Sequence, residues 1–194
     1  LQTFVNNDLG TAIKFTSETD PSKAHENYQS SRTPLIYILQ KYLNPFVYDK
    51  ILYIKSVFVI SFLGPLIFYF CLKQKFKKED NLLILLITSF LFLSPFYRTS
   101  SYWGLEENYG IISLLLAFLF LNLFLERKNQ EDFKGYLQLF FSILFSSACI
   151  YFDQKLLIVP IICFFKIFFC NINLKTKIFT TIVYFIFSLP FIYL

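Results

Sequence analysis

The sequence has no methionine, a single histidine and no Cys-x-x-Cys pair. Zinc sites are built mainly from clustered cysteine and histidine ligands, so this scarcity excludes a zinc centre of that kind. The four cysteines lie within or at the ends of apolar runs, where a thiol behaves as a small hydrophobic side chain. The carboxylates of the predicted external region remain available as oxygen ligands for a metal.

Long apolar runs are abundant. Hydrophobic residues make up 56% of the chain and 27 residues are phenylalanine, which is typical of an integral membrane protein. The runs do not alternate with a period of two, so they predict helices rather than the strands of an outer-membrane barrel. The predicted fold is an all-α polytopic transmembrane bundle, in which residues 1–50 form an external loop with short amphipathic helices. The six predicted spans are residues 51–72, 82–97, 110–125, 136–152, 156–172 and 178–194.

Positive charge is distributed unevenly among the predicted loops. The loops after the first, third and fifth spans are rich in lysine and arginine, whereas the loops at residues 98–109 and 153–155 are not. Short basic loops stay on the cytoplasmic side, so residues 1–50 are expected on the outer side. That side is the periplasm if the chain lies in a bacterial inner membrane, or alternatively the lumen of the endoplasmic reticulum. The basic balance thus reflects topology, and no nucleic-acid partner is expected.

An external region at residues 1–50 needs a segment that carries it across the membrane. The chain has neither a secretory signal nor an initiator methionine, and it ends within an apolar run at residues 191–194. We therefore expect an internal fragment of a longer protein, with at least one span directly upstream that ends near residues 1–5.

Two lysines, Lys55 and Lys166, lie within predicted spans. A charge at the bilayer centre costs roughly 2.5 to 3.5 kcal/mol and often marks a functional site. Each lysine lies within about a turn and a half of a span end, so its ammonium is expected to reach the membrane surface. Gly64-Pro65 and Pro160 are expected to kink their helices, because proline removes a helical hydrogen bond.

Carboxylates, arginines and aromatic side chains gather on the predicted outer side. A carboxylate can act as a general base, and an arginine can bind a phosphate through two hydrogen bonds, while an aromatic ring can stack on a sugar. The alternative is that these loops are only solvated, with tryptophan and tyrosine marking the interface. The candidates are Asp8, Glu18, Asp20 and Arg32 in the first region and Arg98, Tyr102, Trp103, Glu106 and Glu107 in the next external loop.

Four features follow one another along the chain. Asp8 precedes Ser-Arg-Thr-Pro-Leu-Ile-Tyr at residues 31–37, Leu-Ser-Pro-Phe lies at residues 93–96, the Glu106-Glu107 pair comes next, and Tyr-Phe-Asp-Gln-Lys begins a run at residues 151–160 that ends in proline. This order resembles the GT-C superfamily of polytopic membrane glycosyltransferases, of the dolichyl-phosphate-mannose mannosyltransferase type. Members of that superfamily take sugars from polyprenyl-phosphate carriers at the outer or luminal face.

The resemblance implies an inverting displacement at the anomeric carbon, in which a carboxylate takes the proton of the acceptor hydroxyl. Asp8 is preferred for this role because it is expected just after a span, beside the membrane surface. Glu18 and Asp20 form the alternative pair, and they could instead bind a divalent metal such as Mg²⁺ or Mn²⁺. The acceptor, whether glycan, lipid or protein, is not defined by the sequence.

The same resemblance implies binding roles for other residues. Arg32 or Arg98 would stabilise the negative charge that develops on the leaving phosphate. Tyr102 and Trp103 would line the sugar site. The Glu106-Glu107 pair would stand at the start of a helix, where the superfamily often places another acid.

A different class of protein also stays open. A transporter or flippase would bind its substrate near the bilayer midplane between broken helices, and a structural subunit would have no chemistry. The few polar residues at mid-span are mainly serines, which serve close packing in membrane helices more often than transport. The sequence therefore favours glycosyl transfer.

Overall fold

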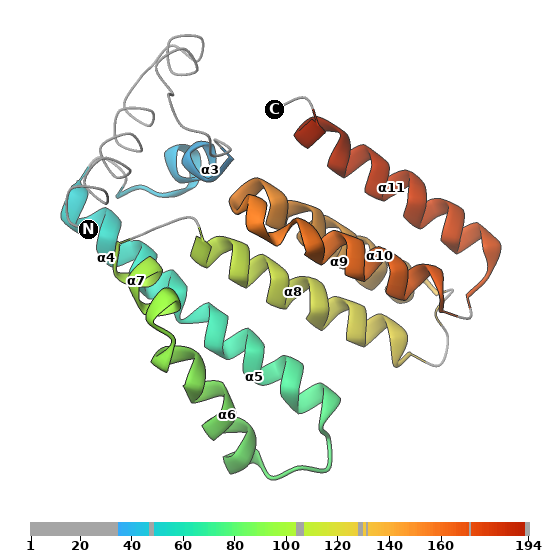
Figure 1. Cartoon of the computed structure of the whole chain (residues 1–194), viewed down its shortest axis with the longest axis horizontal. Helices are drawn as coiled ribbons and strands as arrows, with labels where there is room; N and C mark the ends of the chain where they lie inside the picture. Colours follow the sequence, from blue (N-terminus) through green and yellow to red (C-terminus); the bar gives the residue numbers. More distant parts are fainter. Residues whose placement is uncertain are drawn as a thin grey trace.

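The computed structural model describes residues 35–46, 49–103, 107–127, 130, 132–170 and 172–192. Within these ranges every regular element is a helix, which confirms the all-α prediction for this part of the chain. Figure 1 shows α8 to α11 side by side, with α5 along α8 and α6 splayed away from the group. The elements are α3 (Leu35–Leu43), α4 (Lys50–Ser61), α5 (Leu63–Lys75), α6 (Asn81–Leu93), α7 (Pro95–Trp103), α8 (Glu107–Leu125), α9 (Phe133–Phe152), the short 3₁₀ helix η1 (Gln154–Leu157), α10 (Ile158–Phe168) and α11 (Leu174–Ile192).

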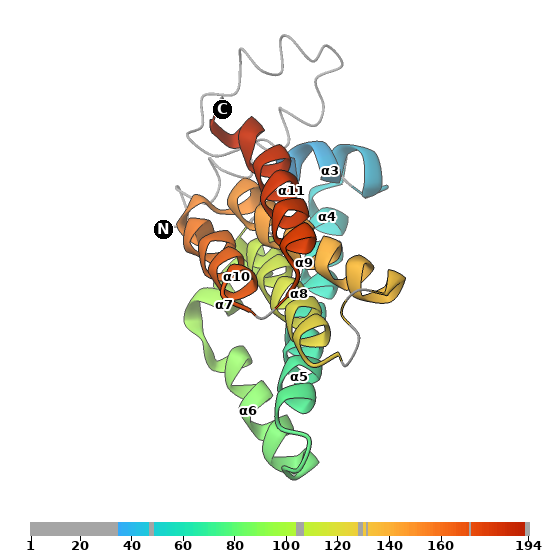
Figure 2. The same cartoon turned by 90° about the vertical axis from the view of Figure 1, so that its right-hand side faces the viewer.

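The core lies between α8, α9, α10 and α11, as the second view also shows (Figure 2). Its fully buried side chains include Leu121, Phe124, Leu139, Ile143 and Ile167. Lipid tails are as apolar as these side chains, so helices in a membrane associate through close packing and interhelical hydrogen bonds. Two serines of α9 supply such bonds: the Ser142 hydroxyl donates to the Ala117 carbonyl at 3.1 Å, and the Ser146 hydroxyl pairs with that of Tyr184 at 2.8 Å.

The first long helical stretch consists of α4 and α5, which are separated at Phe62. The Asp49 carboxylate begins α4 by accepting hydrogen bonds from the amides of Ile51 and Leu52, at 2.8 and 3.0 Å. Such capping satisfies amides that have no partner in the first helical turn. The break follows from Pro65, because proline lacks the amide that would bond to the carbonyl of Ser61. The kink expected at Gly64-Pro65 thus corresponds to an interruption of the helix.

The segment predicted as a span at residues 82–97 is bent. α6 ends at Leu93, and its axis and that of α7 differ by 66°. Ser94 has an extended backbone, with φ −63° and ψ 118°, because the ring of the following proline disfavours the helical conformation at the preceding residue. Pro95 then opens α7, where its missing amide is not needed.

Pro160 also lies in the first turn of a helix, α10, and not in the middle of a long one. The preceding residues form η1, so the predicted span at residues 156–172 is divided between two helices. Proline in a first turn costs no helical hydrogen bond, which explains why it begins α10 instead of kinking it. α10 has 11 residues, about 16 Å of helix against the ~30 Å of a bilayer core.

In the part of the chain that the structure describes, three helical stretches are long and apolar enough to span a membrane, namely Ile51–Lys75, Glu107–Leu125 and Phe133–Phe152. The bent α6–α7 pair would be a fourth if it counts as one span. Large apolar side chains cover the outer faces of these helices, with Leu86, Phe90 and Leu93 of α6 all more than half exposed. These features are those of a membrane protein. The count of six spans stays a prediction from the sequence.

The two ends of the molecule differ in charge. The connections after α5, α8 and α10 lie together at one end, and α3, α7 and the start of α8 lie at the other (Figure 1). We call the first the basic end, because lysine and arginine concentrate there, and the second the α3 end. At the basic end, Lys77 forms an ion pair with Glu126 at 2.5 Å and Arg127 forms one with Asp132 at 2.6 Å. The sidedness expected from the sequence therefore has a structural counterpart, while orientation in a membrane stays a prediction.

Candidate functional site

The site residues predicted from the sequence fall into two groups. Five of them lie outside the described residues: Asp8, Glu18, Asp20, Arg32 and Glu106. The others are all at the α3 end. Arg98 and Tyr102 are exposed on one face of α7, Trp103 is the last residue of that helix, and Glu107 is the first residue of α8 and is only 7% exposed.

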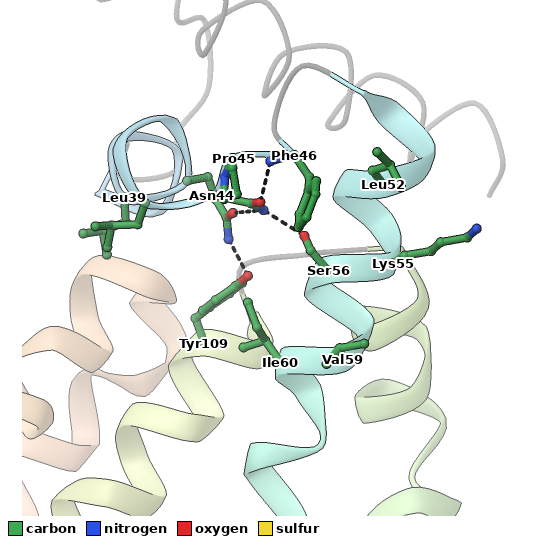
Figure 3. A pocket seen from close by; sticks show the side chains of 12 residues that line it. Leu39, Asn44, Pro45, Phe46, Leu52, Lys55, Ser56, Val59, Ile60 and Tyr109 are labelled. Carbon is green, nitrogen blue, oxygen red and sulfur yellow. Dashed lines mark hydrogen bonds between the residues drawn. The ribbon is translucent and has the colours of Figure 1, made fainter.

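A cavity of 670 Å³ also lies at the α3 end. Figure 3 shows its side chains converging between α3 and α4, with Tyr109 rising from the first turns of α8. α3 is seen nearly end-on in this view while α4 runs upright, so the two helices cross at a steep angle (Figure 3). The lining residues are Leu39, Gln40, Leu43, Asn44, Pro45, Phe46, Leu52, Lys55, Ser56, Val59, Ile60 and Tyr109.

One wall of the cavity carries a connected set of polar side chains. The Gln40 amide donates to the Tyr109 hydroxyl, and the Asn44 amide donates to Gln40 Oε1 at 2.7 Å and to Ser56 Oγ at 2.8 Å. The Ser56 hydroxyl donates to the Tyr53 carbonyl at 2.7 Å. Because this uses the one proton of that hydroxyl, Ser56 can only accept from Asn44, which fixes the orientation of the Asn44 amide.

Both amides are almost fully buried, Gln40 at 5% and Asn44 at 9% exposure. A buried amide without partners destabilises a protein by about 1 to 3 kcal/mol. Here each amide is bonded, and Asn44 Oδ1 also accepts the backbone amide of Phe46 at 3.0 Å. The network thereby ties α3 to α4 and to α8, and it holds the polar wall in one arrangement.

The remaining walls are apolar, apart from one cation. Leu39, Leu43, Leu52, Val59 and Ile60 supply most of the surface. Lys55 is exposed, and its ammonium extends away from the amide network (Figure 3). An apolar cavity with one polar wall and a flanking cation suits an amphiphile whose chain avoids water while its anionic head stays near the surface.

A second polar cluster lies directly behind the cavity. The Asn108 amide donates to the hydroxyls of Ser61 and Ser101, to the latter at 2.9 Å. Each serine hydroxyl donates its own proton to the backbone carbonyl four residues earlier, at 2.8 Å for Ser61 and 2.7 Å for Ser101. Each serine can therefore only accept a hydrogen bond from Asn108. Asn108 Oδ1 is buried and has no hydrogen-bond partner among the described residues.

The second cluster also includes Tyr97, whose hydroxyl donates to the Ser61 carbonyl that Pro65 leaves without an amide. A methyl group on Gly64 would collide with that hydroxyl, so only glycine permits this approach of α7 to α5. Ser61 follows Ile60 in the chain and Asn108 precedes Tyr109. The cluster therefore braces the two helices that carry the cavity wall.

The chemistry of the described cavity is that of binding. Among the described residues that line it, Lys55 and Tyr109 are ionisable and none is a carboxylate. No group of three or more histidine, cysteine, aspartate or glutamate side chains in the described ranges could hold a metal ion. A general base for a group transfer would therefore have to come from residues other than the described lining.

The cavity residues Gln40, Asn44, Ser56 and Tyr109 were not among the candidates from the sequence. One signal was present: Gln40 and Asn44 are four residues apart, so on a helix the two amides would share one face of a largely apolar segment. Polar side chains in such a setting require partners. The partner of Gln40 is Tyr109, 69 positions further along the chain, and periodicity does not reveal contacts at that separation.

Comparison with known proteins gives no relative for this chain. No protein-family model matches it, no curated protein is found similar, and no solved structure matches the fold. A functional assignment thus depends on the site itself.

Proposed function

We propose that this protein is a membrane glycosyltransferase that moves a sugar from a polyprenyl-phosphate carrier to an acceptor at the α3 end of the molecule. The observation that carries the proposal is the 670 Å³ cavity, with apolar walls for the chain of the carrier and the exposed Lys55 at its edge for the phosphate of the head. Its position supports the proposal too, since Arg98, Tyr102 and Glu107 lie at the same end.

The proposed reaction is a single displacement. The acceptor oxygen forms a bond to the anomeric carbon while the bond between that carbon and the carrier phosphate oxygen breaks, and the electron pair leaves with the phosphate. A carboxylate takes the proton of the acceptor hydroxyl. Asp8 is assigned this role, with Glu18 and Asp20 as alternatives, because it is expected just after a span, beside the membrane surface, and because no described residue of the lining is a carboxylate. Lys55 would stabilise the negative charge on the leaving phosphate.

The test uses the full chain reconstituted in liposomes with a radiolabelled polyprenyl-phosphate sugar and an acceptor extract from the source membrane. We expect label in a glycoside with the unchanged chain, and a loss of at least about a hundredfold with Asp8→Asn, the range for removing a general base. The matched control is Glu79→Gln, which alters an exposed carboxylate at the basic end. Transfer by Asp8→Asn at the unchanged rate would remove Asp8 from the role, and absence of transfer by the unchanged chain would remove the proposal.

A second candidate function is transport, which the 66° bend between α6 and α7 favours. Transporters often form their substrate sites at discontinuous helices. The two functions give different results in the same liposomes, because a transporter moves solute across the bilayer without forming a glycoside.

A further inference from the structure

A second apolar groove lies at the basic end, far from the cavity along the chain and on other helices. It has a volume of 550 Å³ and is formed by Leu125 at the end of α8 and by Ile161, Ile162, Phe165, Lys166 and Phe169 along α10 and just beyond it. Phe165 is 50% exposed and Phe169 is 78% exposed. These side chains form an outward-facing apolar surface that a membrane would cover with lipid.

Of the described residues that line this groove, Lys166 alone carries a charge. Its ammonium lies 6.0 Å from the centre of the Phe118 ring on α8, and no described carboxylate forms an ion pair with it. A ring face compensates an ammonium only in part for the water it loses in an apolar setting. The groove thus contains a cation that an anion would stabilise.

A second lysine, Lys177, lies over the aromatic side chains at the end of α10. The Lys177 ammonium lies 5.5 Å from the centre of the Phe168 ring. Phe168 contacts Phe169 edge to face at 5.9 Å, and Phe169 stacks on Phe165 at 5.8 Å. Phe165 and Phe169 of this ring set line the groove together with Lys166, so positive charge is concentrated where the groove meets the basic end.

We propose that this groove binds a glycerophospholipid with a net negative headgroup. One acyl chain lies along Ile161, Ile162 and Phe165, and the phosphate is bound by Lys166. Lys166 belongs to the last turn of α10, so its flexible stem can carry the ammonium from Phe118 to the headgroup level. Charge complementarity selects the occupant, since a zwitterionic lipid would leave the positive charge of this region without a net counter-charge.

The test measures lipid retention by native mass spectrometry. The full chain is extracted from vesicles that contain equal amounts of phosphatidylglycerol and phosphatidylcholine with the same acyl chains. We expect phosphatidylglycerol to be retained about fivefold more, as one lysine at a membrane surface provides, and Lys166→Gln to abolish the preference. Lys166→Arg should keep it. The matched control is Lys175→Gln, an exposed lysine at the start of α11 that does not line the groove.

A third variant, Ile162→Trp, fills the groove and should lower the retention of both lipids. Equal retention of the two lipids by the unchanged chain would overturn the proposal, and so would equal effects of Lys166→Gln and Lys175→Gln, which would indicate surface charge alone. Unchanged phosphatidylglycerol retention in Ile162→Trp would place the lipid elsewhere and would also overturn it. This site is independent of the proposed glycosyl transfer, so each proposal can fail without the other.

Discussion

At the scale of single residues, the Tyr97 hydroxyl donates a hydrogen bond in place of the backbone N–H that Pro65 lacks. Pro65 cannot donate to the Ser61 carbonyl, and the Tyr97 hydroxyl donates to it instead. Both groups are buried, since Tyr97 is 2% exposed and Ser61 is 4% exposed. A side chain from a distant helix thus makes a break in α4–α5 tolerable within an apolar surrounding.

Tyr97→Phe removes that donor and should lower the free energy of unfolding by about 1 to 3 kcal/mol, because it leaves a buried carbonyl unbonded. Adding Pro65→Ala should recover much of the loss, since alanine at position 65 supplies the missing amide. The measurement is a double-mutant cycle of unfolding in detergent, with Tyr102→Phe as the control because Tyr102 is 60% exposed. Strictly additive effects of Tyr97→Phe and Pro65→Ala would contradict this account.

Asp132 is a residue whose contribution depends on pH. Its carboxylate accepts hydrogen bonds from Arg127 Nε and Nη2 at 2.9 and 2.6 Å, and from the Gly135 amide at 2.6 Å. The hydrogen bonds from Arg127, followed by that from Gly135, hold the pKa of Asp132 below its ordinary value. A lowered pKa in the folded state contributes stability that is complete above the unfolded-state pKa and is lost as pH falls through the folded-state pKa.

Asp132→Asn should therefore lower the unfolding midpoint at neutral pH, and the difference from the unchanged chain should shrink only below about pH 4. The measurement is the thermal midpoint in detergent as a function of pH. Glu79→Gln, an exposed change at the same end, serves as the control and should have little effect. A difference that stays constant down to about pH 2 would show that the ion pair is not its origin.

At the scale of elements, approach between helices depends on Gly64. A Cβ atom there would meet the Tyr97 hydroxyl, so Gly64→Ala should push α7 away from α5 and cost about 1 to 3 kcal/mol, as overpacking does. Gly110 provides the comparison: its added Cβ would come within 2.8 Å of the Leu156 Cδ1 atom, the movable end of a side chain. We expect Gly110→Ala to cost less, measured by thermal unfolding. Equal costs would show that contact with the Tyr97 hydroxyl does not determine the cost of adding a Cβ atom at position 64.

The helices themselves could be predicted from the sequence more completely than their breaks. Continuous apolar runs predict α8 and α9 because nothing in them opposes a helix. The division at Ser94 follows from Pro95, whose effect on the preceding residue is local. The cavity could not be predicted in this way, because it requires Gln40 of α3 to meet Tyr109 of α8, a contact that depends on how the helices are placed in space.

At the scale of the whole molecule, the two ends are specialised. The basic end holds exposed lysines, an ion pair between two connections (Lys77 with Glu126) and one within a connection (Arg127 with Asp132), whereas the α3 end holds buried amides and an amphiphilic cavity. Helix α8 runs from one end to the other, and the Asn108 cluster fixes its first turn against the end of α4 beside the cavity. Under the proposed function, the lipid carrier is bound at the α3 end.

The proposal that the cavity binds the lipid chain is best tested with substitutions at two neighbouring residues of α4. Val59 lines the cavity, whereas Phe58 does not, and both side chains are substantially exposed, so neither change should unfold the chain. Val59→Trp should fill the cavity and weaken binding of a fluorescent polyprenyl phosphate about tenfold or more, the effect of losing ~1.4 kcal/mol of contacts. Phe58→Trp should leave the affinity unchanged. Similar affinities for the two variants would place the lipid chain outside this cavity and would remove the observation that carries the proposed function.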